Sequence, residues 1–225
     1  MKINDRLKKI GDLVAANSFC LDVGCDHAFL DIYLVKLNKN IKAIASDVLE
    51  GPLVQARKNI KREGLTDKII VKQGDGLDTY EDGVDTIIIS GMGGRNMIGI
   101  FKNNINILKN IDTIIISPNN YQEDVKRFLC KNGFYIDDEI FVKEKKFIYQ
   151  IIKFKKGHRH YSKLEYFIGP KFLEKKEELY FEYYDKELKS REIILQILPK
   201  NCFSRRFKVK QEIKMINKAI KNDIK

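Results

Sequence analysis

The apolar residues of this 225-residue chain fall into short runs that alternate with longer amphipathic stretches. Seven runs have the length and the β-branched or aromatic content of strands: residues 19–23, 41–47, 68–73, 84–90, 112–117, 134–142 and 146–154. Apolar positions at helical spacing occur in residues 5–16, 28–38, 52–63, 94–108 and 121–132. Strands that alternate with helices for five rounds predict right-handed crossovers and a mostly parallel sheet.

The last two strands follow a different rule. Only the four residues KEKK (143–146) join them, which is too short for a crossover helix. They are therefore expected to form an antiparallel hairpin at the edge of the sheet. Five parallel strands followed by such a hairpin make an α/β fold with a seven-stranded, mostly parallel sheet. This is the pattern of Rossmann-like class I methyltransferases.

The final third of the chain predicts a separate helical domain. Residues 155–161 (KKGHRHY) are interpreted as a hinge, which divides the chain into domains 1–157 and 158–225. One helix is expected from Pro170 to about Leu198, where Pro199 ends it. A second helix carries an apolar seam, formed by Val209, Ile213, Ile216, Ile220 and Ile224. Two helices with such seams predict an antiparallel coiled coil.

The charge is unevenly placed along the chain. The formal net charge is +11, and residues 151–225 contribute 20 basic and 10 acidic side chains to it. A basic face favours phosphate-bearing partners, so we expect nucleic acid to contact this part. No apolar run approaches the ~18 residues of a membrane span, and the N-terminus lacks the apolar centre of a secretory signal. We therefore expect a cytoplasmic protein with no membrane partner.

Cysteine and histidine usage gives no sign of a metal site. Cys20, Cys25, Cys130 and Cys202 are scattered without a CxxC pair, which favours free thiols. His158 and His160 form an HxH pair in the expected hinge, and no further ligand lies near them in sequence. We expect a solvated loop here and no metal.

The segment LDVGCDHAF (residues 21–29) indicates the kind of ligand. It reads as a buried strand that enters a turn and then a helix. Dinucleotide-binding turns need GxGxxG, and this turn contains only Gly24. Asp26 would repel a pyrophosphate, whereas S-adenosylmethionine has no phosphate and carries an ammonium and a sulfonium. The electrostatics favour this cofactor over NAD, and Cys25 and His27 are expected to line the same turn, with a structural role for His27 left open.

Two further carboxylates follow the next strands. Asp47 ends the second strand and can accept hydrogen bonds from both ribose hydroxyls. Asp75, followed by Gly76, comes after the third strand and can bind the amine of the adenine ring. Val48 is expected to line the same cofactor site. A lone aspartate is as often a helix cap, but three in succession on strand tips favour a ligand site.

Small and polar residues follow the fourth and fifth strands. SGMGGR (residues 90–95) leaves room near Gly91 for the methionine moiety or the substrate, although a simple glycine turn is the alternative. Met92 and Arg95, with Pro118 and Asn119 after the fifth strand, are the candidate substrate-binding residues. The polar–Pro–Pro–aromatic motif of enzymes that methylate exocyclic amines is absent after the fourth strand.

Six motifs together resemble one family, the bacterial tRNA adenine N1-methyltransferases that modify adenine 22. The matching segments are GCDHAFLD (24–31), SDVLEGP (46–52), GDGL (74–77), DTIIISGMGG (85–94), SPN (117–119) and IGPKFLEK (168–175). The resemblance covers nearly the whole chain. The departures from the family pattern are Cys25 for Thr, Asp31 for Pro, Asp47 for Glu and Ser117 for Gln.

The resemblance implies a reaction and a partner. The chain is expected to transfer a methyl group from S-adenosylmethionine to N1 of adenine 22 in tRNA and to act as a monomer. N1 already has a lone pair, so Asp26 is expected to act catalytically by orienting the base through its N6 amine. The alternatives are a methyltransferase for another RNA base or a protein, a non-catalytic RNA-binding scaffold, and, more distantly, a nicotinamide-dependent oxidoreductase.

Overall fold

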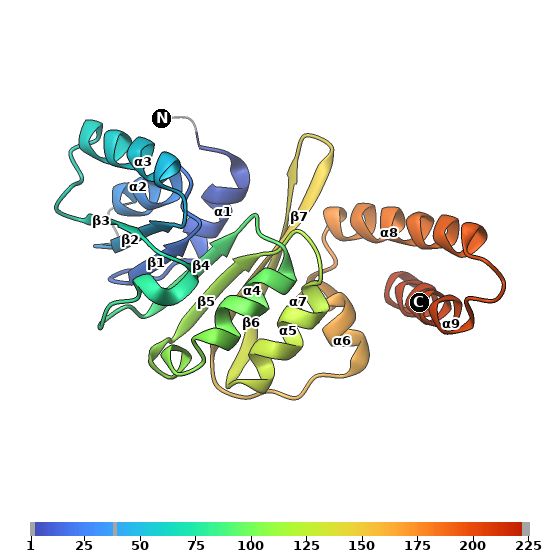
Figure 1. Cartoon of the computed structure of the whole chain (residues 1–225). Helices are drawn as coiled ribbons and strands as arrows, with labels where there is room; N and C mark the ends of the chain where they lie inside the picture. The colour runs from blue at the N-terminus through green and yellow to red at the C-terminus, as the bar shows by residue number, and fades with distance from the viewer. Residues whose placement is uncertain (1–2, 38–39, 222–225) are drawn as a thin grey trace. The chain divides into compact units, whose positions relative to one another are not determined.

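The computed structural model describes residues 3–37 and 40–221. The chain divides into two compact units, residues 1–159 and 160–225 (Figure 1). Across the described residues, no helix is both long enough and apolar enough to cross a bilayer.

The first unit is built on one seven-stranded sheet. Its strands are β1 (Phe19–Val23), β2 (Lys42–Asp47), β3 (Ile69–Gln73), β4 (Thr86–Ser90), β5 (Thr113–Ser117), β6 (Phe134–Glu144) and β7 (Phe147–Lys156). They pair in the order β3-β2-β1-β4-β5-β7-β6. The first five strands are mutually parallel, and β7 is antiparallel to both β5 and β6. The expected parallel sheet with an antiparallel hairpin is therefore confirmed, although β7 extends through residues 155 and 156, which had been assigned to the hinge.

Helices cover both faces of this sheet (Figure 1). They are α1 (Asp5–Leu13), α2 (Phe29–Lys36), α3 (Glu50–Arg62), α4 (Gly94–Asn103) and α5 (Gln122–Lys131), with short 3-10 helices η1 (Gly76–Thr79) and η2 (Ile107–Asn110). Contacts join α1 to α2 and α2 to α3, and separately α4 to α5. The isoleucines of β4 and β5, residues 87–89 and 114–116, are fully buried between these layers. Pure Ile runs thus form the central strands because both of their faces are covered.

The strand directions determine where a site can form. The carboxyl ends of β1 to β5 lie at one edge of the sheet because these strands are parallel. The loops that leave this carboxyl edge are residues 24–28, 48–49, 74–75, 91–93 and 118–121. The candidate site residues lie on these loops or on the first turns that follow them, except Asp47, which is the last residue of β2.

The second unit is helical. It contains α6 (Lys163–Ile168), α7 (Pro170–Lys175), α8 (Glu178–Ile197) and α9 (Phe203–Lys221). The single helix expected from Pro170 to Leu198 is wrong, because Lys176 adopts a left-handed conformation with φ of 44° and separates α7 from α8.

Helices α8 and α9 pack against each other. The seam of α9 buries Val209 and Ile216, whereas the last seam position, Ile224, lies outside the described residues. The Tyr180 hydroxyl in α8 donates to the Ala219 carbonyl in α9 at 3.1 Å, and Tyr184 donates to the Ile168 carbonyl at 2.8 Å. Both rings are buried, so these tyrosines belong to the core of the unit and are not a surface for stacking bases.

Candidate active site

The turn after β1 has an unusual backbone. Gly24, Asp26 and Ala28 all have positive φ, of 78°, 53° and 57°. For a residue with a side chain this region is sparsely populated, and such conformations cluster at turns and functional sites. The amides of Gly24 and Cys25 both donate to the Ser46 carbonyl at 2.9 Å. Asp26 thus adopts a glycine-like conformation. The amides of Gly24 and Cys25, which could have bound a phosphate, already donate hydrogen bonds within the protein.

The Asp26 side chain faces solvent. Its side chain is 71% exposed, and its carboxylate lies 3.5 Å from Nε2 of His27. Helix α2 starts after Ala28, and no side chain among the described residues caps it. The alternative that Asp26 is a helix cap is therefore wrong. Its carboxylate is accessible to a ligand at the carboxyl edge of β1.

The two other strand-tip carboxylates are also accessible. One oxygen of Asp47 accepts the Leu49 amide at 2.9 Å, and its second oxygen has no hydrogen-bond partner within the described part of the chain. Asp75 is exposed and precedes η1, where its side chain makes no capping bond to a described residue. Val48 and Leu49 expose apolar surface beside Asp47. Gly76 follows with φ of 56°, and a β-carbon there would lie 2.9 Å from Ile100.

The loops after β4 and β5 form one hydrogen-bonded structure. Gly91 donates its amide to the Ser117 carbonyl at 3.0 Å, and the Asn119 side chain donates to the Gly91 carbonyl at 2.7 Å. The Asn119 amide also donates to the Met92 carbonyl at 3.0 Å. A β-carbon on Gly94 would lie 2.4 Å from the Asn120 carbonyl oxygen. Gly94 is therefore required for close packing of the two loops, which goes beyond a simple glycine turn.

The predicted cofactor and substrate loops meet at Met92. Its terminal methyl group lies 3.8 Å from the position of a β-carbon on Gly24. Pro118 is buried, and Arg95 is exposed with its guanidinium 4.2 Å from the centre of the Tyr121 ring. Ser117 is fully buried, so its side chain does not reach the surface of the site.

Arg6 lies on the same edge and was not among the residues predicted from sequence. The Arg6 guanidinium in α1 lies 4.4 Å from the centre of the Tyr149 ring, and Nη2 lies 3.7 Å from the position of a β-carbon on Gly91. The Arg6 amide donates to Glu144 at 2.9 Å, and no carboxylate among the described residues pairs with the guanidinium. Because Tyr149 is more than 140 residues away, no local pattern connected these side chains.

A buried pair of carboxyl groups lies beneath the first turn. Asp22 in β1 and Asp31 in α2 are 4% and 0% exposed. Burial and the charge of Asp31 raise the pKa of Asp22 well above its ordinary range. Burial raises the pKa of Asp31 to about 7, and the neighbouring Asp22 and the Asp31 amide offset only part of this rise. The pair therefore retains a proton near neutral pH.

This pair gives the fold a pH dependence. A raised carboxyl pKa means that the folded state binds more protons than the unfolded state between the ordinary value near 4 and about 7. Stability is therefore expected to fall as pH rises through that range. Asp31→Asn should raise the free energy of unfolding. This increase should be larger at about pH 8 than at about pH 5, by on the order of 1 kcal/mol. Urea denaturation at both values measures this, and an equal effect at both would contradict it.

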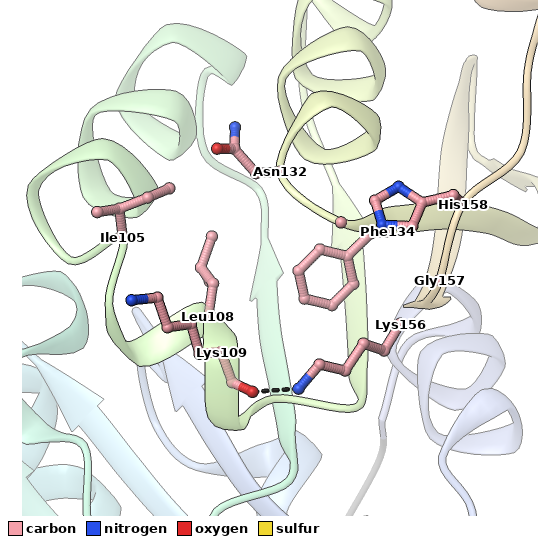
Figure 2. Close-up of a pocket in the computed structure, with 9 residues that line it drawn as sticks. Ile105, Leu108, Lys109, Asn132, Phe134, Lys156, Gly157 and His158 are labelled. Carbon is pink, nitrogen blue, oxygen red and sulfur yellow. Dashed lines mark hydrogen bonds between the residues drawn. The ribbon is translucent and has the colours of Figure 1, made fainter.

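A cavity lies at the opposite edge of the sheet, where β5 and β6 begin and β7 ends (Figure 2). It has a volume of about 360 Å³ and is lined by Ile105, Leu108, Lys109, Asn132, Gly133, Phe134, Lys156, Gly157 and His158. The Lys156 ammonium donates to the Lys109 carbonyl across it. This cavity contains none of the predicted site residues, which all lie at the carboxyl edge.

The strand order and the acidic strand tips define the class of protein. A sheet of order 3-2-1-4-5-7-6 with an antiparallel seventh strand is that of the Rossmann-like methyltransferases. Residues 20–225 match the family described as tRNA (adenine(22)-N(1))-methyltransferase. The chain belongs to this family, as its sequence motifs indicated.

Known relatives agree with this assignment. The tRNA (adenine(22)-N(1))-methyltransferase of Bacillus subtilis is 30% identical over 160 residues, which are 71% of this chain and 67% of that protein. The structure of Mycoplasma capricolum TrmK with S-adenosylhomocysteine has a TM-score of 0.87 at 28% identity and covers 98% of both chains. A Streptococcus pneumoniae protein in complex with S-adenosylmethionine has a TM-score of 0.89 at 32% identity, covering 97% of this chain and 100% of that one.

Proposed function

We propose that this protein transfers a methyl group from S-adenosylmethionine to N1 of adenine 22 in tRNA. The observation that carries the proposal is the set of accessible carboxylates on Asp26, Asp47 and Asp75 at the tips of three neighbouring parallel strands. Family membership supports the same reaction.

The carboxyl edge fits a cationic cofactor that lacks phosphate. Asp47 would accept the ribose hydroxyls and Asp75 the adenine amine, while Val48 and Gly76 would flank the ring. Gly24, Cys25, His27 and Gly91 would surround the methionine end. Among described residues, the side-chain oxygens of Ser90 and Ser117 and Nδ1 of His27 are buried without partners near this edge, which is consistent with a polar ligand there. When bound, the cofactor supplies an electrophilic methyl group.

The protein's contribution to the reaction is positioning and electrostatics. N1 of adenine already carries the lone pair that attacks, so no general base is required. Asp26 would accept a hydrogen bond from the N6 amine, which orients the ring and stabilises the positive charge that develops on it. Guanine presents a carbonyl at the corresponding position and would be repelled. The solvent-facing carboxylate of Asp26 is compatible with this role.

The substrate side of the edge is basic. Met92, Pro118 and Asn119 would surround the target base, because they form the loops that meet the cofactor turn. Arg95, stacked on Tyr121, and the unneutralised guanidinium of Arg6 would bind phosphates of the tRNA. Arg6 is thereby added to the residues identified from sequence.

The C-terminal part would bind tRNA as a separate module. We propose that residues 158–225 form a tRNA-binding domain in which α8 and α9 pack as an antiparallel coiled coil, and that residues 1–157 form the methyltransferase domain. The packing of α8 on α9, the buried seam residues of α9 and the excess of basic residues support this. A tRNA substrate is consistent with action in the cytoplasm, and sedimentation of the purified protein tests whether it is a monomer.

Methyl transfer tests the proposed function. The protein is incubated with labelled S-adenosylmethionine and unmodified bacterial tRNA, and the tRNA is then digested to nucleosides. We expect the label in 1-methyladenosine. Label in another nucleoside would favour a different RNA base as the target, and label in protein would favour a protein methyltransferase. No transfer despite retained S-adenosylhomocysteine binding would favour a scaffold role, and binding of NADH in its place would favour an oxidoreductase.

A further inference from the structure

The turn that joins α8 to α9 exposes large apolar side chains. Phe203 and Phe207, in the first turns of α9, are 77% and 65% exposed. Ile193 and Ile197, in the last turns of α8, are 58% and 74% exposed. Each pair is spaced by four residues, so its members share one face of their helix. A concentration of exposed apolar side chains such as this marks an interaction surface.

These side chains are held on an ordered scaffold. The Arg206 guanidinium donates to the carbonyls of Leu195 and Leu198 at 2.9 and 2.6 Å, which binds the start of α9 to the end of α8. The Cys202 amide donates to the Pro199 carbonyl at 3.1 Å and closes the turn. The backbone that carries the two phenylalanines is therefore held in place, and a partner would bind them without first ordering the turn.

The charge around this turn indicates which kind of partner would bind there. Residues 189–210 contain seven Lys and Arg side chains and one acidic side chain, Glu192. Such a surface repels a second copy of itself and attracts a polyanion. Cations interleaved with exposed aromatic rings are typical of surfaces that bind unpaired nucleotides, because each base offers a flat face for stacking.

We propose that the tip of the helical hairpin, defined by Ile193, Ile197, Phe203 and Phe207, binds unpaired bases of the tRNA by stacking them on the two phenylalanine rings. The tip is therefore a second recognition surface, distinct from the residues that hold the target adenine. Bases within an RNA helix are already stacked on their neighbours, so the occupants are nucleotides of a loop or a single-stranded end. This inference rests on the proposed function for the identity of the RNA.

Paired substitutions separate stacking from general apolar contact. In the variant Phe203→Leu/Phe207→Leu the tip stays apolar but loses its aromatic faces, whereas Phe203→Tyr/Phe207→Tyr keeps them. We expect the leucine variant to raise the KM for an unmodified tRNA transcript about 10-fold or more, from ~1–3 kcal/mol for each stacked base. The kcat of the leucine variant and its affinity for S-adenosylhomocysteine should match those of the wild type. The tyrosine variant should match the wild type in KM, kcat and this affinity. An unchanged KM in the leucine variant would overturn the proposal.

A binding measurement makes the test independent of methyl transfer. Fluorescence anisotropy with a labelled single-stranded RNA, and with the duplex of the same sequence, should show that the full-length protein prefers the single strand. The leucine variant should lose this preference and the tyrosine variant should keep it. If methyl transfer to tRNA fails while this preference holds, the proposed function is wrong and the tip still binds unpaired bases. A wild-type dimer that the leucine substitutions convert to monomer would contradict the proposal, because the tip would then bind a second copy.

Discussion

Asp26→Asn is expected to lower kcat for methyl transfer to tRNA about 100-fold, which is the typical effect of removing one preorganised electrostatic contact to a transition state. Asparagine has the same shape and also tolerates a left-handed conformation, which Asp26 adopts with φ of 53°. The substitution therefore removes the charge while the turn after β1 is retained. Affinity for S-adenosylhomocysteine should stay within about twofold, because the interaction is with the target base. Single-turnover rates with saturating tRNA measure the effect directly.

The matched control for this substitution is Asp67→Asn. Asp67 is an exposed aspartate in the turn before β3, at the opposite edge of the sheet, and the chemical change is identical. This control should keep wild-type kcat. If Asp26→Asn keeps wild-type turnover as well, Asp26 has no catalytic role and the orientation of the adenine must come from other residues.

Lys126→Met is expected to destabilise the first unit by about 3–5 kcal/mol, which is the usual effect of removing one partner of a buried ion pair. Lys126 in α5 and Glu139 in β6 are both fully buried, and the ammonium lies 2.8 Å from the carboxylate. Methionine keeps the length and apolar stem of lysine, so the main change is the loss of the positive charge beside Glu139. Calorimetry should record a melting temperature lower by roughly 6–20 °C.

Two further variants determine whether charge pairing is the cause. Lys126→Met combined with Glu139→Leu removes both charges and should recover most of the lost stability, because a buried ion pair is often replaceable by apolar residues. Arg57→Ala breaks the exposed pair with Glu50 and should change the free energy of unfolding by about 1 kcal/mol or less. A Lys126→Met protein as stable as the wild type would contradict a stabilising role for this ion pair.

The strands were predictable because their signal is local. The Ile runs of β4 and β5 need cover on both faces, and only a parallel sheet between helix layers provides it. Helix ends were less predictable: α4 ends at Asn103, whereas the apolar pattern continued to residue 108. The break at Lys176 lies in a charged segment without Gly or Pro, so no residue type there predicted a left-handed conformation.

The site residues that could be predicted are likewise those with a local sequence signal. Asp26, Asp47 and Asp75 could be identified because each lies at or just after the end of a strand, and parallel strands bring such residues to one edge. Arg6 could not be identified, because its placement depends on Tyr149 and Glu144, which are distant in the sequence. Asp31 was noted as a departure from the family pattern, but its pairing with buried Asp22 required the packing of α2 on the sheet.

The most direct test of the central claim is methyl transfer to two unmodified tRNA transcripts that differ only at position 22. One transcript carries adenine there and the other guanine, with the pairing partner changed where needed to keep the fold. We expect 1-methyladenosine at position 22 of the first transcript and no methyl incorporation in the second. Equal incorporation in both would contradict the assignment of adenine 22 as the target, and absence of incorporation in both would contradict a tRNA methyltransferase activity altogether.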